Sequence, residues 1–304
     1  MLIKHKNFLK NCRYLLECAI VKFALWFFLV IGVKNSANLA AKIAKIVGKR
    51  MAVNNLAYKN LSLAIPELNE EEKNDILTKM WDNLGRVVGE FFYVAGCKVE
   101  KIKQFAKAEK ESQKNIEFII ENFAKKNIGG IIFSGHIGNW EVGPKFLINA
   151  GINISTVYRP LNNLYVENIT TTIRGSELIK KGVAGSKKII EKIKNGGFVI
   201  ILVDQKVSEG QAIDFFHKPA ITTTSLARIA LKYNVPLIPA YVTRIGQQSK
   251  FLVTIEKPLE LDDFKKSNQE QAISEITLLI NKKLEGWIKK HPEQWFWVHN
   301  RWKS

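Results

Sequence analysis

Five short apolar segments in the second half of the chain constrain the fold most strongly. Each is rich in Val, Ile, Leu or Phe, and each is bounded by Gly, Pro or polar residues, as buried strands are. They are Gly129–Gly135, Ile152–Tyr158, Gly197–Asp204, Pro236–Arg244 and Lys250–Pro258. Helical stretches are expected among them at about 139–150, 162–173, 186–195 and 222–234. This alternation predicts an α/β fold with a mostly parallel central sheet flanked by helices.

The first 126 residues have a different pattern. Residues 36–126 are expected to be mostly helical, including Leu68–Gly96, which opens with acidic residues and ends near a glycine. After the sheet, Asn268–Lys290 has the spacing of an amphipathic helix. We therefore divide the chain into an N-terminal membrane anchor (1–35), a helical extension packed on the core (36–126) and an α/β core (127–304).

The segment Tyr14–Val33 raises the question of membrane attachment. It is about as long as a membrane-spanning helix, for which ~20 residues suffice, but Glu17 and Lys22 interrupt it. Three interpretations stay open: an anchor that spans or lies in the membrane, a soluble amphipathic helix docked on the core, and a cleaved signal peptide. We favour the anchor. Basic residues flank the segment on both sides, so charge does not set its orientation.

The charge balance indicates an anionic partner. Lys and Arg number 46 against 28 Asp and Glu, a net charge of +18. Nucleic acid, a phospholipid surface, a phosphorylated substrate or an acidic protein would each fit this excess. The three cysteines, Cys12, Cys18 and Cys97, form no CxxC pair, so a zinc or redox motif is not supported. They are interpreted as reduced thiols, consistent with a domain that faces the cytosol.

The stretch Phe133–Gly143, FSGHIGNWEVG, carries the most chemistry. His136 follows the carboxyl end of a predicted strand, where open α/β sheets place their active sites. Gly138 lets the backbone approach a ligand closely, and Asn139 is expected to cap a helix that begins at Trp140. Glu141 would then fold back toward His136 and hold its ring, which suits a general base for an alcohol or amine.

Simpler interpretations of these residues exist. His136 could be a loop histidine and Glu141 an ordinary acid of a first helical turn, since H-x4-E alone is a weak pattern. Arg159 could pair with a surface acid, and Asp204 could be a turn residue. No second His or Cys lies at metal-ligand spacing, so no metal is expected.

The box HIGNWE resembles the H-x4-D/E acyltransferase motif, and its Glu form after SGH is similar to the late acyltransferases of lipid A biosynthesis, the lauroyl and myristoyl transferases. Further blocks of the same family follow in order along nearly the whole chain. They are VYRP (157–160), Arg174, LVDQ (202–205), the stretch 215–244 and PEQWFWVHNRWK (292–303). Beyond Arg174, the match is loose as far as Gly182.

The resemblance implies a glycerolphosphate-acyltransferase-like fold and transfer of an acyl chain from an acyl-carrier-protein thioester to a hydroxyl of a lipid A precursor glycolipid. It implies His136 as the base, Glu141 as its orienting partner, and no metal or organic cofactor. Arg159 and Arg174 would meet phosphates or carboxylates of the acceptor, and Asp204, Asn139 and Gly138 would complete the substrate site. The expected location is the inner (cytoplasmic) membrane, with the catalytic domain on the cytoplasmic side of an anionic bilayer.

Other function classes remain for comparison. A sibling enzyme would acylate another glycolipid or a phospholipid precursor. A hydrolase is disfavoured because no GxSxG or HExxH occurs, and a nucleotide-dependent enzyme because no P-loop or GxGxxG occurs. A non-enzymatic protein that binds nucleic acid or membrane would concentrate its lysines on one face, whereas here they are scattered; no nucleic-acid partner is expected.

Overall fold

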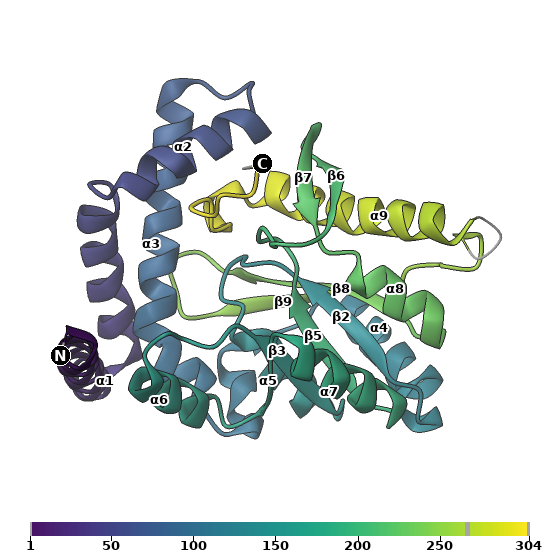
Figure 1. The fold of residues 1–304 in the computed structure, drawn as a ribbon, viewed down its shortest axis with the longest axis horizontal. Helices are drawn as coiled ribbons and strands as arrows, with labels where there is room; N and C mark the ends of the chain where they lie inside the picture. The colour runs from purple at the N-terminus through teal and green to yellow at the C-terminus, as the bar shows by residue number, and fades with distance from the viewer. Residues whose placement is uncertain (1, 265–267, 303–304) are drawn as a thin grey trace.

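A seven-stranded sheet forms the centre of the computed structural model, which describes residues 2–264 and 268–302 (Figure 1). The strand order is β1-β9-β8-β2-β5-β3-β4, and every neighbouring pair is parallel except β8 and β9. The strands are β1 (Ala106–Lys107), β2 (Gly130–Ser134), β3 (Ile154–Tyr158), β4 (Glu177–Lys180), β5 (Phe198–Leu202), β8 (Leu237–Arg244) and β9 (Phe251–Ile255). The predicted fold class and all five predicted strands are confirmed.

Helices cover both faces of the sheet, because buried strands alternate their side chains between the two faces. On β2, Ile131 and Phe133 face one apolar core and Ile132 faces the other. The first core is closed by α7 (Val183–Lys194), α8 (Ser225–Tyr233) and α9 (Gln269–Lys290). The second is closed by α4 (Lys110–Asn122) and α5 (Val142–Asn149).

The N-terminal part consists of helices that stand against one side of the core. They are α1 (Leu2–Gly48), α2 (Ala52–Ala64) and α3 (Glu70–Ala95). Helix α3 begins with a capping box between Asn69 and Glu72. Its Gly85 and Gly89 allow α1 to pack closely, since an added Cβ at either would come within 2.4 Å of a backbone oxygen of α1.

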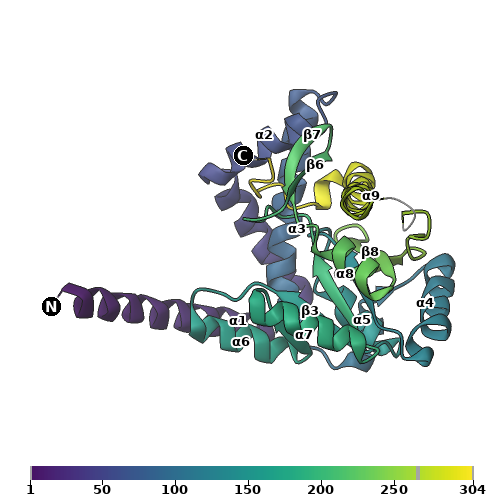
Figure 2. The same cartoon turned by 45° about the vertical axis from the view of Figure 1, so that its right-hand side comes forward.

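Helix α1 bends at Gly32, whose φ of 79° and ψ of 161° are not helical. The N-terminal end of α1 projects from the body of the molecule, as Figure 2 shows. Within the described residues, one helical segment is long and apolar enough to cross a membrane, Leu9–Gly48, with a mean hydropathy of 2.2 in its most apolar window.

Some elements were not predicted. The edge strands β1 and β4 are short, and the hairpin β6 (Gln211–Phe215) and β7 (Lys218–Thr222) forms a separate two-stranded sheet. Short 3-10 turns lie at Val99–Gln104, Ala124–Lys126 and Pro292–Gln294, whereas α6 (Leu164–Arg174) forms where a helix was expected at about 162–173. Because β1 joins the sheet from within residues 36–126, the predicted helical extension contributes to the α/β layer as well. The three-part division of the chain stays a prediction.

Candidate active site

His136 lies just beyond the carboxyl end of β2, as predicted, and its side chain is 16% exposed. Its Nδ1 is 2.8 Å from Oδ1 of Asp204, and its backbone N–H donates to Oδ2 of the same carboxylate at 2.8 Å. Asp204 follows β5, which pairs in parallel with β2 so that Ser134 is opposite Leu202. The ends of two adjacent strands therefore bring the histidine and the aspartate together.

Asp204 is fully buried, and both of its carboxylate oxygens take part in hydrogen bonds. Trp295 donates its indole N–H to Oδ2 at 2.8 Å. Burial alone raises the pKa of Asp204, but the charge and hydrogen bonds of His136 outweigh it and hold the pKa of this carboxyl well below its usual value. An ionised Asp204 requires His136 to carry its proton on Nδ1, which leaves the Nε2 lone pair for chemistry.

Gln205 and a second histidine face that lone pair. The Nε2 amide of Gln205 lies 3.3 Å from Nε2 of His136 and 3.0 Å from Nε2 of His299. Burial lowers the pKa of His299 to about 4, so this ring is neutral near pH 7. Neutral His299 accepts from the amide, and the Gln205 amide bridges both rings. Neither Gln205 nor His299 is among the site residues predicted from the sequence.

The predicted partnership of His136 with Glu141 is wrong in this structure. Glu141 instead accepts two hydrogen bonds from Arg174, from Nε at 2.9 Å and from NH2 at 2.6 Å. The guanidinium also lies 5.3 Å from the ring of Phe91. A bidentate Arg–carboxylate pair satisfies both Glu141 oxygens, and the end of β5 supplies the carboxylate that His136 needs. The ion pair keeps the pKa of Arg174 above its ordinary value although burial opposes this.

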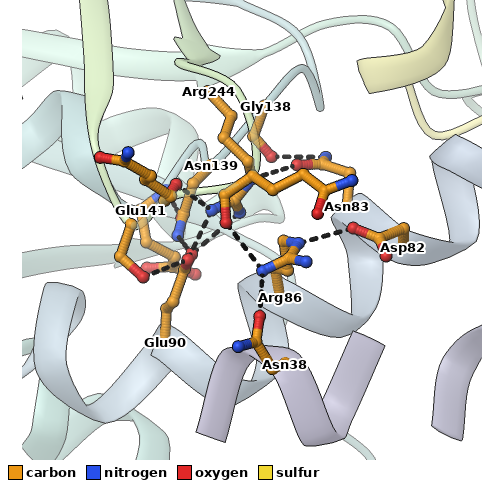
Figure 3. Close-up of polar contacts among 12 residues, drawn as sticks. Asn38, Asp82, Asn83, Arg86, Glu90, Gly138, Asn139, Glu141 and Arg244 are labelled. Carbon is orange, nitrogen blue, oxygen red and sulfur yellow. Dashed lines mark hydrogen bonds and ion pairs between the residues drawn. The ribbon is translucent and has the colours of Figure 1, made fainter. Parts of the chain in front are cut away.

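A buried polar network holds the loop that follows His136 (Figure 3). Glu90 of α3 accepts from Asn139 at 3.0 Å and from both terminal nitrogens of Arg244, at the end of β8. Asn83 donates to the carbonyl of Gly138 at 2.9 Å and accepts from Nε of Arg244. The side chains of Arg244 and Glu90 are 4% and 0% exposed. Helix α3 and β8 thus fix the backbone on which His136 stands.

Gly138 is tightly packed in this loop, and the predicted start of the helix that follows needs correction. Gly138 has φ of 58°, and a Cβ there would lie 2.3 Å from the carbonyl oxygen of Val242, so its close approach is to β8. Helix α5 begins at Val142 rather than at Trp140. Asn139 does accept from the N–H of Glu141, at 3.3 Å, but its amide nitrogen is committed to Glu90. Whether Gly138 and Asn139 also touch substrate stays a prediction.

Arg159 is exposed and follows β3 directly. Burial, and after it the charge of Arg159, lower the pKa of Lys181. Two neighbouring cations of this kind are suited to a phosphate or carboxylate. Arg159 does not join the His136–Asp204 contacts, and its binding role stays a prediction.

The C-terminal segment closes one side of the site. Phe296 donates its backbone N–H to the carbonyl of His136 at 3.2 Å, and Gly138 donates to Gln294 at 3.0 Å. The ring of Trp140 lies 4.9 Å from that of His136. The ring of Trp140 also lies 6.4 Å from that of Phe296, so the C-terminal aromatic segment packs against the loop that follows His136.

The enclosed space behind the loop is small. An apolar cavity of about 20 Å³ is lined by residues that include Ser134, Trp140, Leu147 and Tyr241. This is room for about one water molecule, so an acyl chain would have to widen it or bind elsewhere. In the part of the chain that the structure describes, no three His, Cys, Asp or Glu side chains are grouped so that they could hold a metal ion.

Comparison with known proteins identifies a family for this chain. A family model described as bacterial lipid A biosynthesis acyltransferase matches residues 4–304.

The chain belongs to this acyltransferase family.

Relatives in the lipid A acyltransferase family share modest identity with it. A lipid A biosynthesis acyltransferase of Haemophilus influenzae is 26% identical, over 85% of this chain and 79% of the relative. The lipid A biosynthesis lauroyltransferase and palmitoleoyltransferase of Escherichia coli K12 are 27% and 22% identical, over 86% and 82% of this chain and 82% and 78% of the relatives. This protein is therefore an acyltransferase of lipid A biosynthesis.

Among solved structures, a 1-acyl-sn-glycerophosphate acyltransferase of Thermotoga maritima is 14% identical. The match covers 81% of this chain and 98% of that chain, with a TM-score of 0.35.

Proposed function

We propose that this enzyme transfers a fatty acyl chain from an acyl-carrier-protein thioester to a hydroxyl of a lipid A precursor at the membrane surface. The observation that carries the proposal is the 2.8 Å contact between Nδ1 of His136 and buried Asp204. It fixes the tautomer and leaves Nε2 as a base within a half-open site.

The reaction follows from this tautomer. Nε2 of His136 takes the proton of the acceptor hydroxyl as its oxygen attacks the thioester carbonyl. The imidazolium that forms is stabilised by Asp204, and the carbon–sulfur bond then breaks. The departing thiolate takes the proton back from His136, so the enzyme returns to its starting state. The acceptor hydroxyl displaces the Gln205 amide, which lies 3.3 Å from Nε2.

Charge supports the assignment of substrates. Arg159 and Lys181 offer cations to an acceptor phosphate, and the net charge of +18 suits an acidic carrier protein and an anionic bilayer. Arg174 is a weaker candidate for substrate contact because Glu141 already occupies its guanidinium. The unpaired cysteines fit a catalytic domain on the cytoplasmic side of the inner membrane.

The acyl chain length and the acceptor need direct measurement. Relatives named for lauroyl and palmitoleoyl transfer match this chain about equally, and a one-carbon difference is worth only ~0.8 kcal/mol in an apolar site. The alternative acceptor is another glycolipid or a phospholipid precursor. A non-enzymatic basic binding protein does not account for the His136–Asp204 pair.

The test is acyl transfer by the purified full chain. A series of acyl-carrier-protein thioesters is offered with a phosphorylated lipid A precursor and, separately, with a lysophospholipid, and the products are weighed. We expect a lipid A precursor product and expect His136→Ala to lower transfer by roughly 10²–10⁴-fold. His217→Ala is the control, because His217 is exposed at the β6–β7 turn. Equal transfer by wild type and His136→Ala would remove the base from the mechanism.

A further inference from the structure

Helix α1 carries an apolar face that no part of the described chain covers. Leu9, Leu16, Ile20, Phe23, Phe27 and Val30 are exposed and recur at intervals of three, four or seven positions, so they form one stripe along the helix. Leu15 and Trp26 are exposed beside this stripe. The opposite side of the helix contains Tyr14, Cys18 and Phe28, which are partly or fully buried.

Other parts of the molecule form hydrogen bonds with this helix near both ends of its apolar segment. Near the start, Asn163 donates its side-chain amide to the carbonyl of Tyr14 and to Glu17, both at 2.9 Å. Near the end, the hydroxyl of Tyr93 donates to the carbonyl of Phe28 at 2.8 Å. Tyr14 and Phe28 lie about 21 Å apart along the helix axis, because an α-helix rises ~1.5 Å per residue.

Those contacts conflict with a helix that crosses the bilayer. The hydrocarbon core is about 30 Å thick, so a spanning α1 would take the loop at Asn163 into it or across it. That loop has irregular backbone, and Glu167 beside it is 3% exposed and bonded to Tyr158 and Leu161. Irregular backbone that faces lipid leaves unsatisfied polar groups at a cost of several kcal/mol each.

We propose that α1 lies in the plane of the membrane, with its apolar stripe in one leaflet, and that both its N-terminal end and the catalytic core stay on the same side. The proposal rests on the membrane attachment in the proposed function. The partner is an anionic phospholipid bilayer, because basic Lys10, Arg13 and Lys22 border the stripe.

The start of α6 supplies a second contact with the same surface. Leu161, Leu164 and Tyr165 are exposed, and they lie where α6 meets α1. A groove of about 800 Å³ at this junction is lined by Lys10 and Arg13 together with Leu9, Leu161 and Val166. Basic and apolar groups side by side suit the phosphate and the upper chain of a phospholipid. The junction therefore reaches the headgroup level together with α1.

Sidedness tests the proposal directly. Two single-cysteine forms of the full chain are made after Cys12, Cys18 and Cys97 are replaced by Ser or Ala. One carries Lys10→Cys at the start of α1, and the other carries Val183→Cys, at a position 83% exposed on the catalytic core. Sealed right-side-out and inside-out membrane vesicles are treated with a membrane-impermeant maleimide. We expect the same vesicle type to label both positions, and labelling of the two positions in opposite types would overturn the proposal.

The depth of α1 in the bilayer provides a second test. A fluorophore on Phe23→Cys should be quenched more by nitroxides near the lipid headgroups than by nitroxides at chain ends, since Phe23 lies midway along the stripe. A spanning helix would reverse this order. Val183→Cys is the control and should not be quenched by either. Failure to sediment with membranes would also overturn the proposal, whereas loss of acyl transfer with the expected labelling would count only against the proposed reaction.

Discussion

In the proposed mechanism, one ring nitrogen of His136 orients the ring and the other acts as the base. Nδ1 donates to Asp204, a carboxylate that is fully buried and also bonded to Trp295. Nε2 faces the Gln205 amide, a neutral donor that a substrate hydroxyl can replace without leaving a buried charge unpaired. The pairing therefore explains both how the ring is held and how the acceptor can enter.

Replacing the aspartate tests which carboxylate supports the base. In Asp204→Asn the amide can donate to Nδ1 and so favour the tautomer with its proton on Nε2, which cannot act as a base. We expect kcat for acyl transfer to fall by roughly 10²–10⁴-fold with the fold retained. Glu141→Gln should retain far more kcat, because Glu141 contacts Arg174 instead. An equal loss of kcat in both variants, at equal thermal stability, would return the orienting role to Glu141.

His299 should make the enzyme sensitive to acid. Its pKa is about 4 in the folded protein and near 6.5 in the unfolded chain, so between these values the unfolded state binds more protons. The free energy of unfolding therefore falls as pH drops through this window, on the order of 2 kcal/mol for this residue. Urea unfolding of His299→Asn between pH 7 and pH 4 should show a smaller loss than wild type; parallel curves would contradict the assignment.

Site residues could be predicted from the sequence only where a titratable side chain directly follows a predicted strand. His136 and Asp204 each follow an apolar strand, so both were selected, but their pairing depends on β2 and β5 being neighbours. The two residues are 68 positions apart, and Gln205 and His299 are 94 apart. Glu141 was chosen as the partner because it is near in sequence, and the bidentate hold of Arg174 could not be read from spacing.

At the scale of elements, the strands that can be predicted from the sequence are the buried ones. β2 and β8 are wholly buried and β5 is mostly buried, so these three strands appear in the sequence as largely apolar runs. β4 has the sequence ELIK at a sheet edge, and β6 and β7 mix polar and apolar residues in an outlying hairpin, so neither stands out from a loop. Helix boundaries agreed within a few residues because caps and glycines mark them, as Asn268 does for α9.

The buried ion pair between Glu90 and Arg244 joins α3 to β8. Its removal measures how much this contact contributes to the free energy of unfolding. Its side chains are almost fully buried between α3 and β8, so Glu90→Ala leaves an unpaired buried guanidinium. We expect a loss of 3–5 kcal/mol in the free energy of unfolding, in the range typical of broken buried pairs. Glu270→Ala is the matched control, since its pair with Arg228 is 61% and 47% exposed and should be worth less than about 1 kcal/mol.

The same variants also report on the active site. Asn139 and Gly138 are held by Glu90 and Asn83, so Glu90→Ala should lower kcat even at temperatures where the protein stays folded. Glu90→Gln should recover part of this activity because its amide oxygen can still accept from Asn139. Full activity in folded Glu90→Ala would show that the loop does not need α3.

For the whole molecule, the N-terminal helices link α1, the proposed membrane-binding segment, to the loop that follows His136. Asn38 of α1 accepts from Arg86 of α3 at 2.8 Å, and Arg86 is also paired with Asp82. One turn further along α3, Glu90 holds the loop that carries His136. Helix α1 also packs closely on Gly85 and Gly89 of α3. Helix α3 therefore contacts both α1 and the loop that follows His136.

This arrangement predicts how the enzyme should bind vesicles as salt is raised. A net charge of +18 attracts anionic lipid over a distance that shrinks from about 10 Å at 0.1 M salt to about 3 Å at 1 M. The apolar stripe of α1 does not depend on salt and contributes in proportion to the area it buries in lipid. Cosedimentation with phosphatidylglycerol vesicles should therefore weaken at high salt without being lost, and neutral phosphatidylcholine vesicles should bind less but independently of salt. Complete release from the anionic vesicles at 1 M salt would mean that charge alone holds the protein and that the stripe is not inserted.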